Sequence, residues 1–390
     1  MTVRSHRPDA LPRIVHLDHT SVAGGAEYAL VRMLRASPRW HPLVLVPRGS
    51  SAGVFAELGE TARIRECGVR QRAGVSAGAA SVLFAAGAGL AAQSVATRMH
   101  PGFRSADIVD ANTSRAAAYG ALAAWSSRTP FVVHVRDMTD AEAMGRFGSL
   151  AMRKVALPRA DGVIADTHAA LESAARFLRP DAVTAVIPSA SGVRRSLTGQ
   201  ASSEPLRVGM LARIDPWKGQ RLLIDAFAAA FAGSEAVLEF AGAAPFGHEQ
   251  FATELRSRAA ELGLGERVRF LGHVADVDEL LAGWDIAVQA STRPEPLGQN
   301  VLQYLAAGCA VVVADEGGPV EWVDDGVNGL RFAPRDGAAL TAALRRLGAD
   351  PELRVRMGHA ARRTPGLMED AEVAAAHAEF YADVLSRAER

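Results

Sequence analysis

This sequence has few cysteines, no excess of charge of either sign and no long, strongly apolar run. Each of these features excludes a class of protein. The 390 residues contain 2 cysteines, Cys67 and Cys309, which form neither a CxxC pair nor a Cys/His cluster. A disulfide framework and a structural zinc site are therefore not expected. Lys+Arg and Asp+Glu number 43 each, so the basic excess typical of nucleic-acid binders is missing. These counts favour a reduced, cytoplasmic protein that binds no nucleic acid.

Two segments bear on membrane contact. The uncharged segment from Ala73 to Thr97 is long enough to cross a bilayer, but it consists mostly of Ala, Gly and Ser. A spanning helix needs about 20 predominantly apolar residues, so we expect a buried or docking helix, with membrane-surface contact as the alternative. The basic stretch from Arg146 to Arg159 carries Phe147 and Leu150. It predicts a helix with a solvated basic face, and it leaves open a peripheral contact with acidic lipid at the inner face of the membrane.

Apolar runs that predict strands alternate with helical patterns along most of the chain. At 390 residues, 49% of them hydrophobic, the chain is too long for one ordinary core, and two domains are expected. The alternation is typical of doubly wound parallel sheets. A polar stretch from Ser189 to Pro205 is the predicted linker between domains at residues 1–195 and 205–370. The predicted strands are Arg13–Leu17, Pro42–Val46, Asp107–Asp110, Phe131–Val135, Gly162–Ala165, Ala185–Ile187, Leu206–Leu211, Ala236–Ala241, Val268–Leu271, Ile286–Gln289 and Ala310–Ala314.

The most informative stretch runs from Arg293 to Gly329. A loop with Glu295 between two prolines leads through Gly298 into a helical pattern that ends at Gly308, and a buried strand follows. Free N–H groups and the helix dipole at such a helix start favour a bound anion such as a diphosphate. Glu295 stands where it can accept hydrogen bonds from hydroxyl groups. The stretch therefore predicts a phosphorylated, hydroxyl-rich ligand, namely a nucleotide sugar.

This stretch resembles the signature of the family 4 retaining glycosyltransferases, also called glycosyl transferases group 1. In that family two glutamates bracket seven residues, followed by an Ala-rich helix, a Gly, a strand and a Gly-Gly-Pro turn. The first glutamate is Glu295 here, and Gln303 occupies the place of the second. The resemblance implies the GT-B fold, which is α/β, with two Rossmann-like doubly wound domains facing across a cleft. It further implies an acceptor-binding first domain, a donor-binding second domain and a C-terminal helix, at residues 371–390, that crosses back to the first.

Arg213 and Lys218 form an R-x4-K-G pattern in the turn after a predicted strand. A cation at a helix N-terminus is disfavoured unless an anion is present, so Lys218 points to a bound phosphate rather than to a solvated charge. The resemblance implies that both cations bind the leaving diphosphate and that Glu295 binds the hydroxyls of the transferred sugar.

Gln303 stands where the family has a glutamate that holds both ribose hydroxyls. A carboxylate accepts from both, whereas a glutamine accepts from one and donates to the other. Because hydrogen bonds to charged groups are stronger, the change is expected to weaken donor binding by about 1 kcal/mol. The full set of donor-side residues implied by the resemblance is Gly24, Gly25, Pro296, Leu297, Gly298, Gln299, Asn300, Gln303, His273 and Val274.

First-domain candidates come from strand ends and from one glycine turn. Gly24-Gly25 lies between the first strand and a helix, where the family's glycine loop approaches the diphosphate. By resemblance His134 would lie near the acceptor and act in catalysis with Arg213, Lys218 and Glu295; the alternative is a core histidine within a strand. Asn112, Arg136 and Asp137 are expected on the acceptor side.

Asp276-Val277-Asp278 imitates a metal-binding D-x-D, but it opens a helical pattern. Helix capping accounts for it, and no metal site is expected.

Taken together, the motifs and the resemblance predict a retaining, metal-independent glycosyltransferase of glycan biosynthesis without a cofactor. Its front-face mechanism would let the acceptor attack from the side of the leaving group. The expected partners are a UDP-, GDP- or other nucleotide sugar and a glycan, lipid-linked or small-molecule acceptor. Three alternatives stay open: a nucleotide-sugar epimerase, a sugar-phosphate synthase on the same fold, and a non-catalytic nucleotide-sugar-binding relative.

Overall fold

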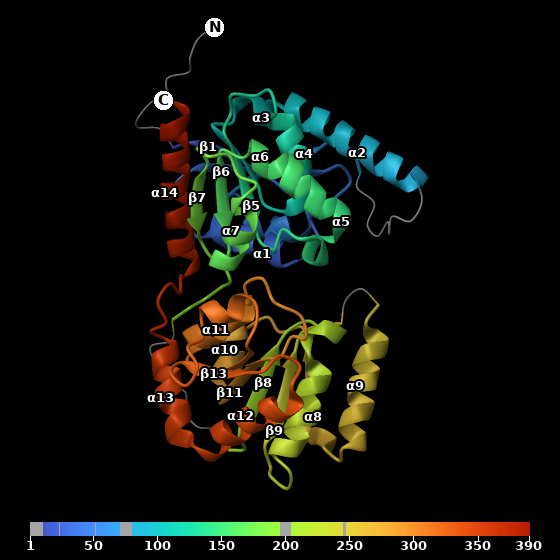
Figure 1. The fold of residues 1–390 in the computed structure, drawn as a ribbon, viewed down its shortest axis with the longest axis vertical. Coiled ribbons are helices and arrows are strands. Elements are labelled where there is room, and N and C mark those ends of the chain that lie inside the picture. Colours follow the sequence, from blue (N-terminus) through green and yellow to red (C-terminus); the bar gives the residue numbers. More distant parts are fainter. Residues whose placement is uncertain (1–10, 23, 51, 71–79, 196–203, 245–246) are drawn as a thin grey trace. The chain divides into compact units, whose positions relative to one another are not determined.

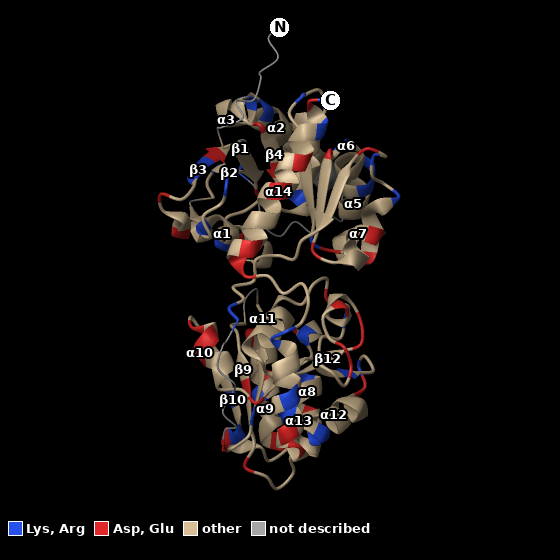
Figure 2. Ribbon diagram, turned by 90° about the vertical axis from the view of Figure 1, so that its left-hand side faces the viewer, with Lys and Arg blue, Asp and Glu red and all other residues tan. Residues whose placement is uncertain are grey.

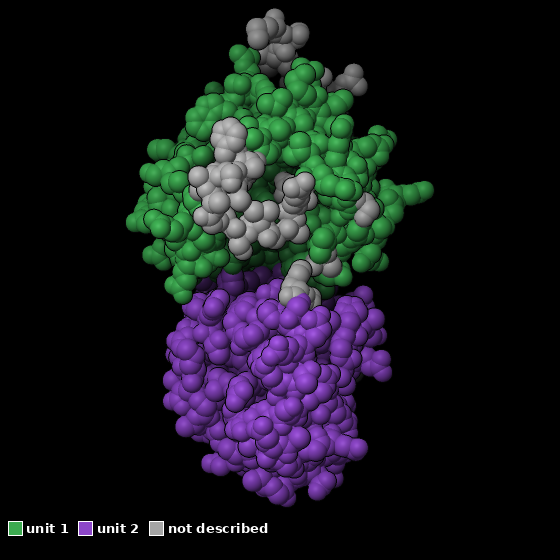
Figure 3. Space-filling view, turned by 90° about the vertical axis from the view of Figure 1, so that its right-hand side faces the viewer, with its two compact units in different colours: residues 1–190, 370–390 green, residues 191–369 purple. Residues whose placement is uncertain are grey.

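The computed structural model describes residues 11–22, 24–50, 52–70, 80–195, 204–244 and 247–390. The chain forms two compact units (Figure 1), residues 1–190 with 370–390 and residues 191–369, coloured separately in Figure 3. Part of the predicted linker, residues 196–203, lies outside the described residues, and so does the stretch 73–79 of the uncharged segment. The C-terminal helix α14 (Asp370–Ala388) is part of the first unit.

The first unit is built on a 7-stranded sheet in the order β3-β2-β1-β4-β5-β6-β7, with every pairing parallel. Its strands are β1 (Arg13–Leu17), β2 (His41–Pro47), β3 (Arg63–Cys67), β4 (Ile108–Ala111), β5 (Phe131–Val135), β6 (Gly162–Ala165) and β7 (Val183–Val186). Its helices are α1 (Gly25–Arg35), α2 (Ala80–Met99), α3 (Pro101–Ser105), α4 (Ser114–Ala124), α5 (Ala141–Ala151), α6 (Leu157–Arg159), α7 (His168–Ala175) and α14.

Helices cover this sheet closely because several contact positions carry small residues. All of β4, β5 and β6 is buried, as expected for parallel strands with helices on both faces. Ala residues make up much of the buried surface of α4. A Cβ atom at Gly162 of β6 would lie 2.8 Å from Val384 and 2.9 Å from Phe380, so α14 packs directly on the strand.

The second unit holds a 6-stranded sheet in the order β10-β9-β8-β11-β12-β13, again parallel throughout. Its strands are β8 (Arg207–Leu211), β9 (Val237–Ala241), β10 (Val268–Gly272), β11 (Ile286–Gln289), β12 (Ala310–Ala314) and β13 (Gly329–Phe332). Its helices are α8 (Gln220–Ala230), α9 (Glu249–Glu261), α10 (Val277–Ala282), α11 (Gln299–Ala307), α12 (Gly337–Ala349) and α13 (Pro351–Ala361). Figure 2 shows that charged residues of both signs lie on helices and loops, while the strands carry few.

The strand order of each sheet indicates where its ligand is expected to bind. In each sheet the order reverses once, between β1 and β4 and between β8 and β11. Ligands of open parallel sheets bind outside the carboxyl ends of the strands at such a reversal. The loops after β1, β4, β8 and β11 are therefore where each unit is expected to bind its ligand.

All eleven predicted strands are present, with ends shifted by at most two residues, and the edge strands β3 and β13 were not predicted. No described helix is long and apolar enough to cross a membrane. The D-x-D imitation is a helix cap as expected, since Asp276 accepts from the backbone N–H of Glu279 at the start of α10.

Candidate functional site at the strand ends

The turn after β8 carries both predicted phosphate-binding cations. It contains the 3-10 turn η3 (Pro216–Lys218), and Asp215 Oδ1 caps this turn by accepting from the backbone N–H of Trp217 at 3.3 Å. Gly219 then opens α8 with a φ of 81°. A Cβ atom there would lie 1.8 Å from the carbonyl oxygen of Ala290, so only glycine allows this approach to the end of β11. The backbone N–H of Thr292 donates to the carbonyl of Trp217 at 2.7 Å, which locks the two loops together.

Lys218 and Glu295 form an ion pair, although they are far apart in sequence. Lys218 Nζ contacts Glu295 Oε1, and the hydroxyl of Ser291 donates to the same oxygen at 2.6 Å. The side chains are 18% and 8% exposed. The structure therefore joins the predicted phosphate cation and the predicted sugar-binding carboxylate at one partly buried position.

Arg213 lies on the same turn and shares an aromatic neighbour with Lys218. Its guanidinium pairs with Asp215 at 3.1 Å and is 46% exposed. Lys218 Nζ lies 4.0 Å from the ring centroid of Trp217, and Arg213 Cζ lies 5.8 Å from it. Both cations thus lie close to one indole ring. Trp217 was not predicted, because a tryptophan before a lysine carries no sequence signal of its own.

The Gly-Gly-Pro turn shapes the loop that holds Glu295. The backbone N–H of Gly318 donates to the carbonyl of Glu295 at 2.7 Å. A Cβ atom at Gly317 would lie 2.5 Å from that carbonyl oxygen, and one at Gly318 would lie 2.3 Å from the carbonyl oxygen of Pro296. The predicted donor-loop residue Leu297 is buried in the core beside α11, and Gly298 starts that helix with a φ of 76°.

Helix α11 is tied to the rest of the unit by its polar face. Asn300 Nδ2 donates to the carbonyl of Leu211 at 3.1 Å, and the Tyr304 hydroxyl accepts from the N–H of Leu211 at 2.7 Å. Gln303 Nε2 donates to the carbonyl of Ser191 at 2.7 Å. These contacts attach the helix to the end of β8 and to the start of the unit.

The remaining predicted donor-side residues lie further along the sheet or at the helix start. Gln299 is the first residue of α11. His273 and Val274 follow β10; His273 is exposed, and Val274 packs against the same apolar cluster as α11.

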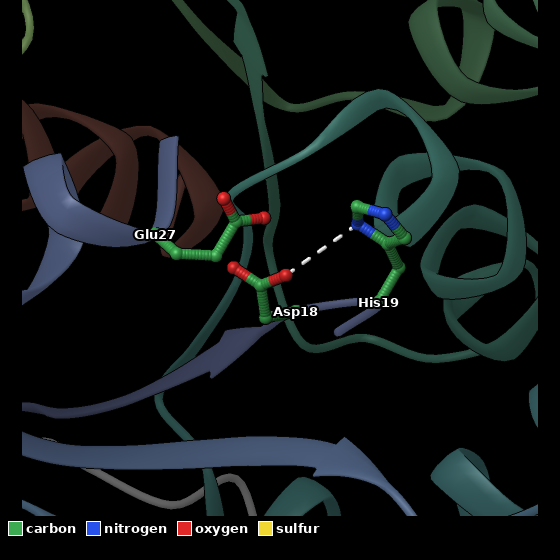
Figure 4. A group of neighbouring side chains, drawn as sticks. All are labelled: Asp18, His19 and Glu27. Carbon is green, nitrogen blue, oxygen red and sulfur yellow. Dashed lines mark ion pairs between the residues drawn. The ribbon is translucent and has the colours of Figure 1, made fainter. Parts of the chain in front are cut away.

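In the first unit three titratable side chains meet at the carboxyl end of β1. Figure 4 shows Asp18 and Glu27 pointing toward each other, with His19 beside them. Asp18 is fully buried and accepts from Asn112 Nδ2 at 2.6 Å. Burial, together with the charge of Asp18, raises the pKa of Glu27 to about 7. The predicted glycine turn lies here, since a Cβ atom at Gly24 would be 2.4 Å from Glu27 Oε2.

The same three residues could hold a metal ion. One ligand atom from each of Asp18, His19 and Glu27 lies within 4.8 Å of the others. His19 Nδ1 is already hydrogen-bonded to Thr113 Oγ1 at 2.9 Å, so an ion bound through this nitrogen would compete with that contact. The absence of a metal requirement stays a prediction. The sequence signal for this group is the pair of acids, Asp18 and Glu27, that flank the Gly-Gly turn.

Two of the predicted acceptor-side residues are in direct contact. Arg136 donates to the side-chain oxygen of Asn112 at 2.7 Å and to its backbone carbonyl at 3.0 Å. Its other nitrogen reaches Ser189 Oγ, which donates to Asp166 at 2.8 Å. Burial raises the pKa of Asp166. Asp137 lies at the same strand end and is half-buried. A continuous polar network therefore follows the ends of β1, β4, β5 and β6.

His134 requires a correction. Its ring is buried, with Nε2 3.2 Å from Asp110 Oδ2, and it stacks on His377 of α14 at a centroid distance of 5.4 Å. Asp110 also bonds His16 at 2.9 Å and accepts from the Tyr381 hydroxyl at 2.9 Å. Burial alone would raise the pKa of Asp110, but the two histidines hold it well below its usual value. His134 is thus the core histidine of the alternative reading, and the catalytic role expected for it has no support in this position.

Two family models match the chain. Residues 199–364 match the glycosyl transferases group 1, and residues 24–190 match a glycosyl transferase 4-like domain. The chain is 32% identical over 157 residues to the lipopolysaccharide core biosynthesis mannosyltransferase LpcC of Rhizobium leguminosarum bv. viciae. The aligned region covers 40% of this chain and 44% of the relative. It is 32% identical over 155 residues to the mannosylfructose-phosphate synthase of Agrobacterium fabrum, covering 38% and 34%. These matches span between a third and a half of the length of the relatives.

Among solved structures, Anabaena Alr3699/HepE in complex with UDP superposes with a TM-score of 0.77. The alignment has 25% sequence identity and covers 95% of this chain and 100% of the other.

Proposed function

The chain belongs to the glycosyl transferases of group 1 and has the GT-B fold, and from this premise we propose that it moves a sugar from a nucleotide-diphosphate sugar to an acceptor hydroxyl with retention of configuration. The observation that carries the proposal is the contact between Lys218 and Glu295 next to Arg213. A diphosphate needs fixed positive charge to bind. The sugar attached to it needs a hydrogen-bond acceptor close to that charge. This pair supplies both in one partly buried place.

Charge balance supports the same assignment. Without a ligand, Lys218 is paired with Glu295 and Arg213 with Asp215. A diphosphate brings additional negative charge, which both cations can meet by turning from their carboxylates. The carboxylate of Glu295, released from Lys218, then accepts from the sugar hydroxyls. Preorganised cations of this kind stabilise charge that develops on the leaving group.

The proposed reaction needs no nucleophile from the protein. The bond between the anomeric carbon and the diphosphate oxygen breaks, and the acceptor oxygen forms its bond to the same carbon from the same face. The acceptor proton passes to a phosphate oxygen of the departing nucleoside diphosphate. The side chains position the substrates and stabilise the diphosphate, and the reaction as proposed uses no metal.

We assign the donor to the second unit and the acceptor to the polar network of the first. The relative HepE was solved with UDP, which supports a nucleoside diphosphate donor here. The likeness to a lipopolysaccharide core mannosyltransferase supports a glycan acceptor in glycan biosynthesis. Asn112 and Arg136, joined by hydrogen bonds at the strand ends, are the proposed acceptor contacts.

A sugar-phosphate synthase is the second candidate, favoured by the likeness to mannosylfructose-phosphate synthase. Its acceptor would carry a phosphate, whereas the glycan acceptor would not. An epimerase and a non-catalytic relative are the further alternatives.

The deciding experiment incubates the purified protein with a panel of nucleotide sugars selected by thermal stabilisation. Release of nucleoside diphosphate is then measured with no acceptor, with neutral glycans and with sugar phosphates. We expect release only with a glycan acceptor. Release only with sugar phosphates establishes the synthase. Conversion of the donor alone establishes an epimerase, and binding without any turnover establishes the non-catalytic relative.

A further inference from the structure

Arg335 occupies a backbone conformation that a side chain disfavours. It lies in the turn that joins β13 to α12, where the N–H of Asp336 donates to the carbonyl of Ala333 at 3.1 Å. Pro334 fixes φ at about −65° at the second position of this turn. Arg335 follows at the third position with a φ of 64°. A turn with proline second and a positive φ third normally has glycine at the third position, because glycine adopts this φ without strain.

The side chain of Arg335 binds two neighbouring loops at once. Its Nη1 donates to the backbone carbonyl of Thr292 at 3.1 Å and to Glu316 Oε1 at 2.7 Å. Thr292 belongs to the loop after β11, and Glu316 belongs to the turn after β12. Because β11, β12 and β13 are neighbouring parallel strands, their carboxyl ends meet at one edge of the sheet. One nitrogen atom therefore joins three loops at the edge where the candidate site lies.

Both loops that Arg335 joins also hold Glu295. Thr292 lies in the same loop as Glu295, three residues before it. Glu316 directly precedes the glycine that forms a parallel β-bridge with Glu295. The N–H of the next glycine, Gly318, donates to the Glu295 carbonyl at 2.7 Å. A closed ring of contacts thus runs from Arg335 through both loops to the backbone of Glu295.

The energetics argue against a purely structural role for this arginine. The Arg335 side chain is 54% exposed and that of Glu316 is 17% exposed. An ion pair with an exposed partner contributes little to stability, because water and salt screen it. A glycine at the same position would avoid the backbone strain altogether. The arginine is therefore expected to act through the geometry that it imposes on the loops.

We propose that Arg335 is a positioning residue of the donor site, which holds the backbone around Glu295 in the geometry that sugar transfer requires. The guanidinium acts through the Thr292 carbonyl and the Glu316 carboxylate, and it does not contact the substrate. A misplacement of about 1 Å can lower turnover by about 10²-fold. The effect on turnover rests on the function proposed above, whereas the restraint on the loops rests on the observed contacts.

The test compares glycine with alanine at position 335, because both lack the guanidinium but only glycine relieves the backbone strain. We expect a higher urea midpoint of the second unit in R335G than in R335A. In both variants kcat for the nucleotide sugar should fall by about 10- to 100-fold. R335K, which keeps the charge, should recover part of this loss. S37G is the matched control, because Ser37 is exposed, lies in the first unit and has a φ of 60°, and its turnover should equal that of the wild type.

Two kinetic readouts separate the positioning of Glu295 from general damage to the unit. Free uridine and guanosine diphosphate carry no sugar, so the affinity for whichever of them the wild type binds should stay within about twofold in R335G. Glu316→Ala removes the other end of the ion pair and should lower kcat to the same extent. Adding R335G to Glu316→Ala should lower kcat by less than about twofold more, because residues that act as a unit are not additive.

Hydrogen exchange tests the restraint on the loops without any substrate. The N–H of Gly318, which donates to Glu295, should exchange about tenfold faster in R335G and in R335A. The N–H of Asp285 donates to the carbonyl of Arg207 at 2.9 Å at the opposite end of β11, and its exchange should not change.

Three results overturn the proposal. Normal kcat in R335G shows that the guanidinium positions nothing, and a diphosphate affinity that falls as much as kcat shows general damage to the unit. Unchanged exchange of Gly318 removes the restraint on the loops. A wild-type protein that transfers no sugar overturns the proposed function, and the exchange of Gly318 then still decides the restraint, so the two failures can be told apart.

Discussion

Breaking the ion pair between Lys218 and Glu295 should affect both folding and turnover, by amounts that the structure allows us to work out. At an effective dielectric constant of about 20, two charges about 4 Å apart attract by about 4 kcal/mol. Part of this is offset by desolvation, because the side chains are only 18% and 8% exposed. Replacing Lys218 by Met leaves Glu295 buried with Ser291 as its hydrogen-bond donor. We expect the second unit to lose about 3 kcal/mol of unfolding free energy.

A double-mutant cycle isolates the pair from its surroundings. The single variants Lys218→Met and Glu295→Gln and the double variant are unfolded in urea, following a probe of the second unit because two-domain chains need not unfold in one step. We expect a coupling free energy of about 2–3 kcal/mol. Arg258 and Asp225 form a matched control pair at 2.7 Å in the same unit, with side chains 31% and 40% exposed. Their coupling should stay below about 1 kcal/mol.

Turnover supplies the second half of the prediction. Removing a preorganised group that stabilises a leaving diphosphate lowers kcat by about 10²–10³-fold. Lys218→Met should show that loss at saturating donor, while Arg258→Met keeps normal turnover. Near-normal turnover of Lys218→Met would refute the assignment, and a coupling free energy below about 0.5 kcal/mol would refute the structural argument.

Three further predictions concern other parts of the molecule. Trp217→Leu should weaken nucleoside diphosphate binding by about 3- to 30-fold in calorimetry, because it removes the cation–π contacts, while Trp217→Phe keeps part of them and neither variant alters binding of the nucleoside without phosphates. Glu27, with its pKa raised from 4.5 to about 7, binds its proton more tightly in the folded than in the unfolded state, so its contribution to stability is lost as the pH rises through 7. Relative to Glu27→Gln, the wild type should lose about 2–3 kcal/mol of unfolding free energy between pH 5 and 8, and parallel curves would contradict a pKa of Glu27 raised by burial and by Asp18. Tyr381→Phe removes a hydrogen bond to the buried Asp110 and should cost about 1.5–3 kcal/mol in chemical unfolding of the first unit; an unchanged midpoint would contradict this.

The strands that could be predicted are mostly those whose burial shows in the sequence as a run of apolar residues. β12 is an uninterrupted apolar run, and β5 is apolar except for His134, because helices cover both faces of a parallel sheet. β3 was missed because it lies at the edge of its sheet, and the charged residues of its RIREC sequence are mostly exposed. β13 is also an edge strand and has only four residues, starting with Gly329. β3 was therefore too charged, and β13 too short, to stand out as an apolar run in the sequence.

The candidate site was predictable as a set of residues but not as a set of contacts. Arg213, Lys218 and Glu295 were each identified from the turn pattern and the family resemblance. Their shared neighbour Trp217 was not, because the indole acquires its position only when the turns after β8 and β11 meet. His134 shows the opposite case. The family resemblance gave it a catalytic role, with a core histidine as the alternative, and the residue that covers it, His377, lies in the C-terminal helix.

Gln303 shows how a single contact can reverse a prediction. From the sequence, Gln303→Glu should strengthen nucleotide binding, because a carboxylate accepts from both ribose hydroxyls. The structure places the Gln303 amide against the Ser191 carbonyl at 2.7 Å, and an ionised carboxylate there loses a hydrogen bond and meets a second oxygen. Because the carboxylate is repelled from the Ser191 carbonyl, its side chain is no longer held in place, and we expect this loss of positioning to outweigh the roughly 1 kcal/mol that the stronger ribose contact would contribute. The expected effect of the substitution on nucleotide affinity therefore changes sign, and calorimetry on this variant at pH 8 distinguishes the two arguments.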